Sequence, residues 1–243
     1  MLEKNKIILT GSNGQLGKEL VSLLIQKGYD VIGIDLSHNS EDIEGYLKID
    51  LDITQESQVQ DFYRNLNHKD KISGLVNNAG IAIFTPLEER TYEEIRTVMD
   101  VNIAGTILMT KYFMESTKQL GSKISIVNLG SIYGAIAPDL SIYEDTPRAS
   151  SEIYGMTKAS IINFTQYLAS YYKDTNARFN CVSPGGIEFE QGPIFKKKYS
   201  AKVPLGRMAK TKEISEVIYF LLSEKSSYIN GENIFVDGGL TKW

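Results

Sequence analysis

The chain has 243 residues, 42% of them hydrophobic, a formal net charge of −4 at pH 7 and a single cysteine, Cys181. This length fits one large α/β domain or two small ones, and the lack of a linker-like boundary favours a single domain over residues 1–243. The composition excludes a disordered chain, an intrachain disulfide and a basic nucleic-acid-binding surface. Two scattered histidines, His38 and His68, argue against a metal site, and the lack of a membrane-length or signal-like apolar stretch predicts a soluble cytoplasmic protein with no membrane partner.

Short apolar segments alternate with longer segments of helical periodicity. In chain order we expect a strand at Lys6–Thr10, a helix at Gln15–Lys27, strands at Asp30–Asp35 and Tyr46–Ile49, a helix from Thr54 toward Leu66, a strand at Ile72–Val76, a helix at Tyr92–Lys118 broken near Gly105, a strand at Ser122–Leu129, a helix at Ser151–Tyr172, a strand at Ala177–Val182, a helix at Lys212–Leu222 and a strand at Asn233–Val236. This alternation predicts an α/β fold: a doubly wound parallel sheet of about seven strands with helices on both faces.

Two long segments interrupt the alternation, residues 132–150 and residues 188–204. We expect both to be loops that overhang the carboxyl edge of the sheet, where ligands of open α/β sheets bind. The first carries side chains suited to a polyhydroxylated ligand, although a solvated or oligomer-contacting loop explains them equally well. These side chains are Tyr133, Asp139, Tyr143, Glu144, Asp145 and Arg148.

A glycine-spaced segment joins the first strand to the first helix. Glycines at such a turn permit a tight bend and close approach to a pyrophosphate, whose charge the helix N-terminus then favours. An ordinary glycine turn is the alternative, but the preceding strand and following helix favour dinucleotide binding. The candidate cofactor-binding residues here are Gly11, Asn13, Gly14, Gln15, Leu16 and Gly17.

Further candidates for cofactor binding follow the next three strands. Asp35 ends the second strand and can bond the ribose hydroxyls of NAD, and no Lys or Arg follows in residues 36–39 to hold a 2′-phosphate, so NAD is favoured over NADP. Asp52 and Ile53 can contact adenine, or they can simply begin a helix. After the fourth strand, small residues could let the ribose approach: Asn78, Ala79 and Gly80.

Three side chains suggest redox chemistry on a carbonyl or alcohol. Tyr154 and Lys158 stand one helical turn apart, which places a phenol and an ammonium on the same face. The nearby positive charge should favour phenolate and lower the pKa of Tyr154, and the hydroxyl of Ser131 could hold the substrate oxygen.

These residues resemble the short-chain dehydrogenase/reductase family over nearly the whole chain. The similarity rests on motifs in order: the glycine loop at residues 11–17, Asp52, residues 77–80, Asn102, Ser131, Tyr154 with Lys158, residues 183–187 and residues 237–239. The resemblance implies a single-domain Rossmann fold and a homotetramer or homodimer formed through two long helices.

The resemblance also implies residue roles. Tyr154 would be the general acid or base, Lys158 would lower its pKa and bond the nicotinamide ribose, and Ser131 would hold the substrate oxygen. Asn102 would hold a water that links Lys158 to bulk solvent. The turn after the sixth strand would contact the nicotinamide carboxamide through Pro184, Gly185 and the backbone of Ile187.

The chain departs from the family pattern at two places. The glycine spacing and the long interval between Ser131 and Tyr154 resemble the extended branch of the family, whereas residues 77–80, 183–187 and 237–239 resemble the compact branch. We therefore expect a compact enzyme with an enlarged substrate loop. The tyrosine-rich loop and Lys196–Lys198 also resemble bacterial oxidoreductases of flagellin or surface-glycan modification, which implies carbohydrate biosynthesis.

The sequence thus predicts an NAD-dependent oxidoreductase that interconverts a secondary alcohol and a ketone, with a phosphosugar or nucleotide sugar as the suggested substrate. Two alternatives remain open. A sugar epimerase or dehydratase would retain its NAD through each turnover. A non-catalytic NAD(P)-binding sensor would need neither Tyr154 nor Lys158.

Overall fold

A computed structural model describes residues 5–38, 41–66, 71–117, 123–144 and 150–243. Its centre is a seven-stranded sheet in the order β3-β2-β1-β4-β5-β6-β7, in which every adjacent pair is parallel. The strands are β1 (Lys6–Thr10), β2 (Asp30–Asp35), β3 (Tyr46–Asp50), β4 (Ile72–Asn77), β5 (Ile124–Leu129), β6 (Ala177–Pro184) and β7 (Asn233–Val236). The doubly wound parallel sheet expected from the sequence is confirmed.

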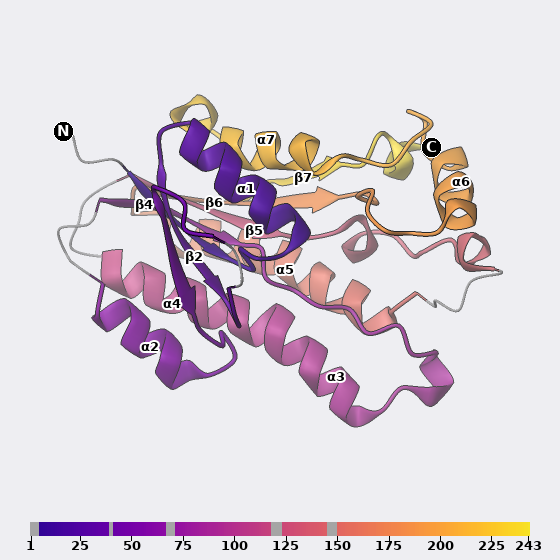
Figure 1. The fold of residues 1–243 in the computed structure, drawn as a ribbon, viewed down its shortest axis with the longest axis horizontal. Helices are drawn as coiled ribbons and strands as arrows, with labels where there is room; N and C mark the ends of the chain where they lie inside the picture. Colours follow the sequence, from indigo (N-terminus) through magenta and orange to yellow (C-terminus); the bar gives the residue numbers. More distant parts are fainter. Residues whose placement is uncertain (1–4, 39–40, 67–70, 118–122, 145–149) are drawn as a thin grey trace.

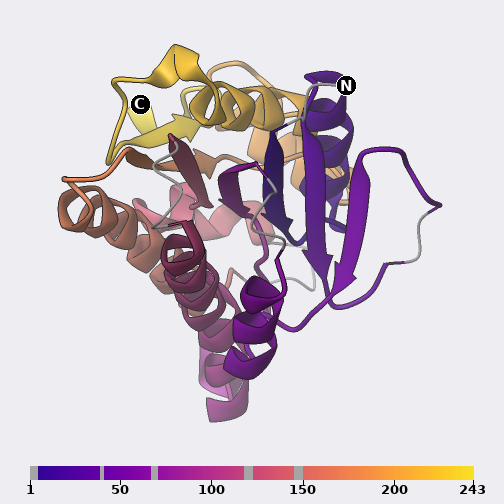
Figure 2. The same cartoon turned by 90° about the vertical axis from the view of Figure 1, so that its left-hand side faces the viewer.

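Helices cover both faces of the sheet, as the views from the front and the side show (Figures 1 and 2). Helices α1 and α7 lie together on one face, and α2, α4 and α5 lie on the other. The helices are α1 (Gln15–Gln26), α2 (Glu56–Arg64), α3 (Tyr92–Met99), α4 (Thr106–Thr117), α5 (Glu152–Tyr171), α6 (Pro193–Ala201) and α7 (Thr211–Leu222). Among helices in the described ranges, none is long and apolar enough to cross a membrane.

Each face of the sheet has its own apolar core. Phe113 of α4 and Phe179 of β6 are fully buried on the α2–α4–α5 side, and Leu20 of α1 and Ile218 of α7 are fully buried on the opposite side. Strand β5 is buried along its whole length, as expected for a central strand covered on both faces. Because the strands are parallel, all their carboxyl ends meet at one edge of the sheet.

The long helical segment expected at residues 92–118 is interrupted, as predicted, at a π-helical turn, η2 (Asp100–Gly105). In such turns the backbone hydrogen bonds span five residues instead of four, and these turns occur often at functional sites. Single 3₁₀ turns occur at η1 (Leu87–Glu89), η3 (Ile132–Gly134), η4 (Leu140–Tyr143), η5 (Glu224–Ser226) and η6 (Leu240–Lys242).

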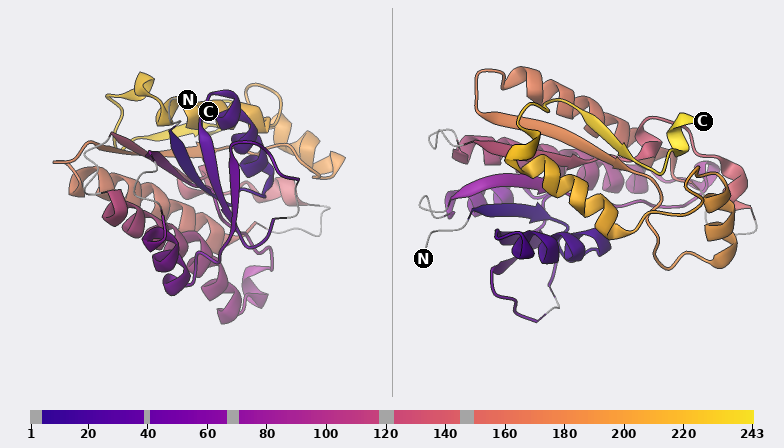
Figure 3. Two further views of the ribbon diagram at one scale, coloured as in Figure 1. Left: turned by 60° about the vertical axis from the view of Figure 1, so that its left-hand side comes forward. Right: turned by 90° about the horizontal axis from the view of Figure 1, so that it is seen from above.

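The prediction that residues 188–204 form a loop was wrong, because this segment contains helix α6. Proline at the first helical position favours its start. Tyr199 anchors the helix in a small satellite core with Ile142, Val203 and Met208, so tertiary packing stabilises a helix whose exposed face is lysine-rich. Seen from above, α6 lies beside the end of the molecule that carries the carboxyl edge (Figure 3).

Candidate active site

Two adjoining cavities lie along the carboxyl edge of the sheet. One, of about 510 Å³, is lined by the glycine loop and by the ends of β2 and β4. The other, of about 490 Å³, is lined by the ends of β5 and β6, by α5 and by α6. Their linings share Gln15, Leu16, Asn78, Gly80 and Ile81, so the two cavities form one continuous cleft. Within the described residues, no group of three or more His, Cys, Asp or Glu side chains is placed to hold a metal ion.

The glycine loop turns tightly and packs closely against neighbouring backbone. Gly11 has φ of +64°, which favours glycine, and a Cβ there would lie 2.8 Å from Cα of Ala79. At Gly17 a Cβ would collide with the carbonyl of Gly11. Gly14 precedes α1 and offers no side-chain cap, so the first amides of the helix have no side-chain partner there. These residues fit an anionic ligand at the N-terminus of α1.

The structure places Asp35 beside this loop. Its carboxylate accepts hydrogen bonds from the backbone N–H of Asn13 at 2.9 Å and of Leu36 at 2.8 Å. Asp35 therefore lines the first cavity in a fixed orientation, as an acceptor for ribose hydroxyls requires. Asp52 and Ile53 line the same cavity. Asp52 accepts hydrogen bonds from the backbone N–H and the hydroxyl of Thr54, but it does not begin a helix, because α2 starts at Glu56 after Gln55.

The residues after β4 lie where the two cavities meet, and Asn78 and Gly80 line both. The amide of Asn78 donates to the carbonyls of Thr10 and Gly11 and ties β4 to the glycine loop. Ala79 donates its N–H to the hydroxyl of Thr10 at 3.0 Å. A Cβ at Gly80 would lie 3.3 Å from both Oδ1 of Asn102 and Nζ of Lys158, so any larger residue here would crowd both side chains.

Tyr154, Ser131 and Lys158 line the second cavity. Ser151 caps α5 and accepts from the backbone N–H of Tyr154 at 3.3 Å, which places Tyr154 in the first turn of the helix. Nζ of Lys158 lies 5.6 Å from the centre of the Tyr154 ring and donates to the carbonyl of Leu129 at 2.7 Å. The structure thus brings Tyr154, Ser131 and Lys158 together in one cavity.

The electrostatics differ from the sequence-based prediction that Lys158 lowers the pKa of Tyr154. Burial raises the pKa of Tyr154, and a side-chain hydrogen bond from Ser131 opposes this shift. Burial also lowers the pKa of Lys158 to about 8. The physical reason is desolvation, which disfavours the charged form of both groups. Lys158 also directs its ammonium to the backbone carbonyl of Leu129.

Asn102 lies in the π-helical turn and is almost fully buried. Its Oδ1 accepts from the backbone N–H of Ile81 at 2.8 Å, and its Nδ2 donates to the carbonyl of Ile81 and to the hydroxyl of Thr157. The side chain therefore joins the segment after β4 to α5, one residue before Lys158.

The turn after β6 closes the second cavity opposite α5. Pro184, Gly185 and Ile187 line it, and Ile187 forms a bridge with Ala209. Nε2 of Gln15 donates to the carbonyl of Glu188 at 2.7 Å, so this turn is tied directly to the start of α1. Every predicted cofactor-binding residue except Gly17 lines one of the two cavities; Gly17 is buried beneath the loop.

The outer wall of the second cavity is rich in aromatic side chains. The hydroxyls of Tyr133 and Tyr143 lie 3.1 Å apart, and Phe195 and Tyr199 of α6 line the same cavity, with the Phe195 ring beside that of Tyr143. A Cβ at Gly134 would lie 2.7 Å from the backbone of Lys158, so η3 packs directly on α5. This close approach fixes the wall relative to the helix that carries the proposed proton donor.

Asp139 and Glu144, two of the carboxylates suited to a polyhydroxylated ligand, do not line this cavity. Asp139 pairs with Lys202 at 2.8 Å, and Glu144 lies 3.7 Å from Lys198. These pairs attach η4 to the end of α6 instead, because the basic segment folds as a helix that packs there. Asp145 and Arg148 lie outside the described residues.

Sequence reasoning missed several residues of the site. Arg90, whose side chain is 2% exposed, pairs with Glu152 at the start of α5. Tyr199 accepts a hydrogen bond from the backbone N–H of Gly186, and burial raises its pKa to about 12. An arginine in a charged segment and a tyrosine after three lysines carry no local signal of burial.

The chain is similar to known proteins over almost its whole length. Residues 12–241 match a family model described as enoyl-(acyl carrier protein) reductase. Carbonyl reductase family member 4 of Xenopus laevis is 33% identical over 96% of each chain, and post-translational flagellin modification protein A of Campylobacter coli is 31% identical over 98% of this chain and 99% of that one. A crystal structure of a short chain dehydrogenase from Leptospira borgpetersenii with bound NAD+ superposes with a TM-score of 0.93 at 39% identity, covering 98% of this chain and 93% of that one.

Proposed function

The chain belongs to the short-chain dehydrogenase/reductase family of oxidoreductases, and from that premise we propose that it uses NAD to interconvert a secondary alcohol and a ketone. The observation that carries the proposal is the meeting of Tyr154, Ser131 and Lys158 in a cavity continuous with the glycine-loop cavity. A proton donor and a cofactor site within one cleft are what carbonyl reduction requires.

The nicotinamide, when bound, supplies or accepts a hydride. The protein residues do the rest. Tyr154 donates a proton to the substrate oxygen in reduction and removes it in oxidation, and the hydroxyl of Ser131 holds that oxygen by a hydrogen bond. Lys158 would bond the nicotinamide ribose. Its ammonium lies 5.6 Å from the centre of the Tyr154 ring and does not offset the burial that raises the pKa of Tyr154. Asn102 holds the segment after β4 against α5, and we propose, as the family resemblance implies, that it also holds a water that links Lys158 to bulk solvent.

The residues of the first cavity would hold the adenosine and pyrophosphate parts of the cofactor. Gly11, Gly14 and the start of α1 suit the phosphates, and Asp35 suits the ribose hydroxyls. The negative charge of Asp35 would repel a 2′-phosphate, and the sequence of residues 36–39 has no Lys or Arg to receive one. The NAD+ held by the Leptospira relative supports the same choice.

For the substrate we propose a sugar derivative. Hydroxyl groups of Ser131, Ser151, Tyr133 and Tyr143 line the cavity with Tyr154 and can bond a polyhydroxylated ligand. The similarity to post-translational flagellin modification protein A supports a carbohydrate-related role. The aromatic side chains of this cavity could pack equally well on the apolar face of a sugar ring or on an apolar ketone. The preference for a sugar derivative therefore rests on the hydroxyl groups.

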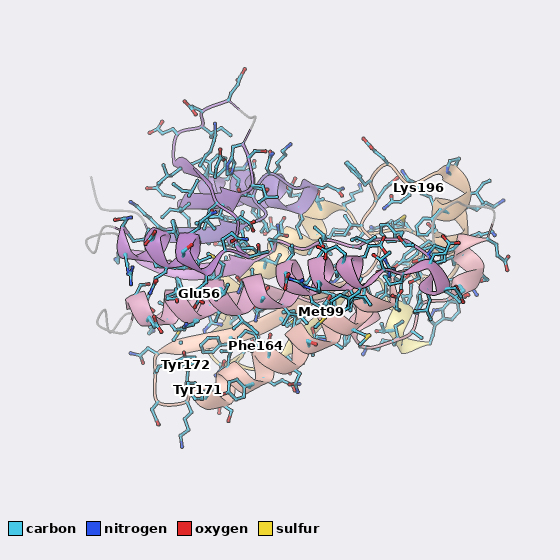
Figure 4. The ribbon with its side chains drawn as sticks, turned by 90° about the horizontal axis from the view of Figure 1, so that it is seen from below. Glu56, Met99, Phe164, Tyr171, Tyr172 and Lys196 are labelled. Carbon is cyan, nitrogen blue, oxygen red and sulfur yellow. The ribbon has the colours of Figure 1, made fainter. Side chains whose placement is uncertain are left out.

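We also propose that the enzyme is a homo-oligomer formed through α4 and α5. An apolar hollow on these helices is lined by Ile103, Ile107, Phe164 and Tyr167. Large apolar side chains are exposed to solvent here, among them Ile107 and Tyr171. Figure 4 shows Met99, Phe164 and Tyr171 along this side of the molecule. Light scattering of the native protein and of Tyr167→Glu tests this, and a native monomer would contradict it.

The substrate proposal is tested by following NADH absorbance with sugars, sugar phosphates, nucleotide sugars and small apolar ketones, with NAD and NADP in parallel. We expect activity with a sugar derivative and a preference for NAD. Activity confined to small apolar ketones would contradict the sugar proposal. Purification with tightly held NAD and no net cofactor turnover would instead indicate an epimerase or dehydratase, and no turnover with any substrate would favour a sensor.

A further inference from the structure

Four side chains form a continuous hydrogen-bonded chain behind the glycine loop. The hydroxyl of Tyr46 donates to Oγ of Ser12 at 3.0 Å, Oγ of Ser12 lies 2.9 Å from Nε2 of His38, and Nδ1 of His38 lies 2.7 Å from Oδ1 of Asp50. Tyr46 and Asp50 come from the two ends of β3, Ser12 from the glycine loop, and His38 from the turn after β2. The chain therefore joins three separate segments.

The direction of these hydrogen bonds follows from the donors. Because Tyr46 donates to Ser12, the Ser12 hydroxyl can donate its own proton to Nε2 of His38. The imidazole then carries its proton on Nδ1 and donates it to the carboxylate of Asp50. In this arrangement each hydroxyl and the imidazole N–H donates once, so the three hydrogen bonds are mutually consistent.

A serine, a histidine and an aspartate in this order also occur in hydrolytic sites, but this serine is not placed for that chemistry. Ser12 is 1% exposed, and the side chain of His38 is 3% exposed. The oxygen of Ser12 already accepts the proton of Tyr46, and neither Ser12 nor His38 lines either of the two cavities of the cleft. A substrate in the cleft could not reach this hydroxyl, so the chain has a positioning role.

The residues packed around the four hydrogen-bonded side chains leave room for them. A Cβ at Gly33 of β2 would lie 2.6 Å from Oγ of Ser12 and would collide with the ring of Tyr46. Glycine at this position therefore makes room for Ser12 and Tyr46 over the sheet. The His38 ring also meets the Tyr46 ring edge to face, with centroids 6.1 Å apart.

The hydrogen-bonded chain fixes the turn that presents Asp35. His38 ties one end of the turn to Ser12, and Nδ2 of Asn13 donates to the carbonyl of Ser37 at 3.2 Å. The backbone N–H of Asn13 donates to Asp35 itself. Both Asp35 and Asn13 line the cavity, so the buried His38 sets where the cavity-facing carboxylate lies without touching a ligand.

We propose that His38 is a specificity-determining positioning residue for the adenosine end of the cofactor, an inference that rests on the proposed function. By locking the turn after β2 to the glycine loop, His38 holds the Asp35 carboxylate where it accepts from ribose hydroxyls. The same lock prevents the turn from opening to admit a 2′-phosphate. Loss of His38 therefore weakens NAD binding and reduces the difference in affinity between NAD and NADP.

The test is calorimetric titration of NAD and NADP into the wild type, His38→Ala, His38→Gln and Tyr46→Phe. The amide that replaces the imidazole in His38→Gln keeps one donor and one acceptor, so this variant should retain more NAD affinity than His38→Ala. Asp42→Asn is the matched control. Asp42 lies between β2 and β3 like His38, but it is fully exposed and pairs with Lys48, which is not part of the hydrogen-bonded chain. Circular dichroism melting establishes that each variant folds.

We expect His38→Ala to raise the Kd for NAD about tenfold and to change the Kd for NADP less than about threefold. Tyr46→Phe should raise the Kd for NAD about threefold, and Asp42→Asn should match the wild type. If His38→Ala fails to fold, His38→Gln and Tyr46→Phe carry the test. Unchanged NAD affinity in the folded variants, with normal wild-type binding, would overturn this inference alone. A wild type that binds neither cofactor would overturn the proposed function and this inference with it.

Discussion

Arg90 donates two hydrogen bonds to the carboxylate of Glu152, from Nε at 2.8 Å and from Nη2 at 3.1 Å. Nη2 also donates to the carbonyls of Ile83 and Thr85, so the guanidinium joins the segment after β4 to the first turn of α5. Hydrogen bonding to Arg90 lowers the pKa of Glu152. Because Tyr154 lies two residues further along α5, this ion pair helps to fix the position of the helical turn that carries the proposed proton donor.

Replacing Glu152 with Gln should weaken this support. The buried Arg90 would keep a neutral partner, and we expect the free energy of unfolding to fall by roughly 2 kcal/mol and kcat to fall severalfold. Urea denaturation and steady-state kinetics measure the two effects. Glu88→Gln is the control, since Glu88 is an exposed carboxylate in η1, two residues before Arg90. Equal stability of Glu152→Gln and Glu88→Gln would show that the ion pair contributes nothing.

The three hydrogen bonds of Asn102 predict a graded loss of stability. Asn102→Ala leaves the N–H and the carbonyl of Ile81 without their side-chain partner in a partly buried position, and we expect a loss of about 3 kcal/mol. Thr157→Val removes the hydroxyl that accepts from Nδ2 of Asn102 and donates to the carbonyl of Tyr154, with an expected loss of about 1–2 kcal/mol. Chemical denaturation of both variants measures these losses, and a larger loss in Thr157→Val would contradict the assignment.

The lowered pKa of Lys158 predicts a dependence of stability on pH. The folded protein holds Lys158 with a pKa of about 8, against 10.5 for an ordinary lysine, so the unfolded chain binds more protons between these values. The stability of the wild type relative to Lys158→Met should therefore rise by about 2 kcal/mol from about pH 7.5 to about pH 9.5. Taking the difference between the two proteins cancels the titration of their common groups. A difference that is flat or falls with pH would contradict burial of the ammonium.

The charge of Asp35 predicts cofactor selectivity. Asp35→Asn removes the negative charge that repels a 2′-phosphate and one of the two acceptors used by backbone amides. We expect the ratio of kcat/KM for NAD to that for NADP to fall at least about tenfold, which corresponds to about 1.4 kcal/mol. Initial rates with both cofactors measure the ratio, and Asp42→Asn is again the control. An unchanged ratio would show that Asp35 does not determine the selectivity.

The strands and most helices were predictable from the sequence because their periodicity is local. The spacing of Leu20, Leu23 and Leu24 already identifies the buried face of α1. Helix α6 was missed, since its stability comes from contacts of Tyr199 with residues outside the helix, among them the distant Ile142. A run of lysines carries no local sign of such packing.

The site was predictable only as a set of residue types. Spacing placed Tyr154 and Lys158 on one helical face, and the glycine loop identified the cofactor end. The burial that raises the pKa of Tyr154, the Arg90–Glu152 pair and the His38 chain all depend on segments that meet only after folding. The ion pairs of Asp139 and Glu144 were unpredictable for the same reason, because their lysine partners lie on α6 or just beyond its end.

The central claim is that Tyr154 carries the proton to and from the substrate oxygen. The most direct measurement compares kcat and the Kd for NAD in the wild type and in Tyr154→Phe, which keeps the ring and removes only the hydroxyl. The account predicts that kcat falls by about 10²–10⁴-fold while the Kd for NAD stays within about threefold. A Tyr154→Phe enzyme that turns over within about tenfold of the wild type would contradict it.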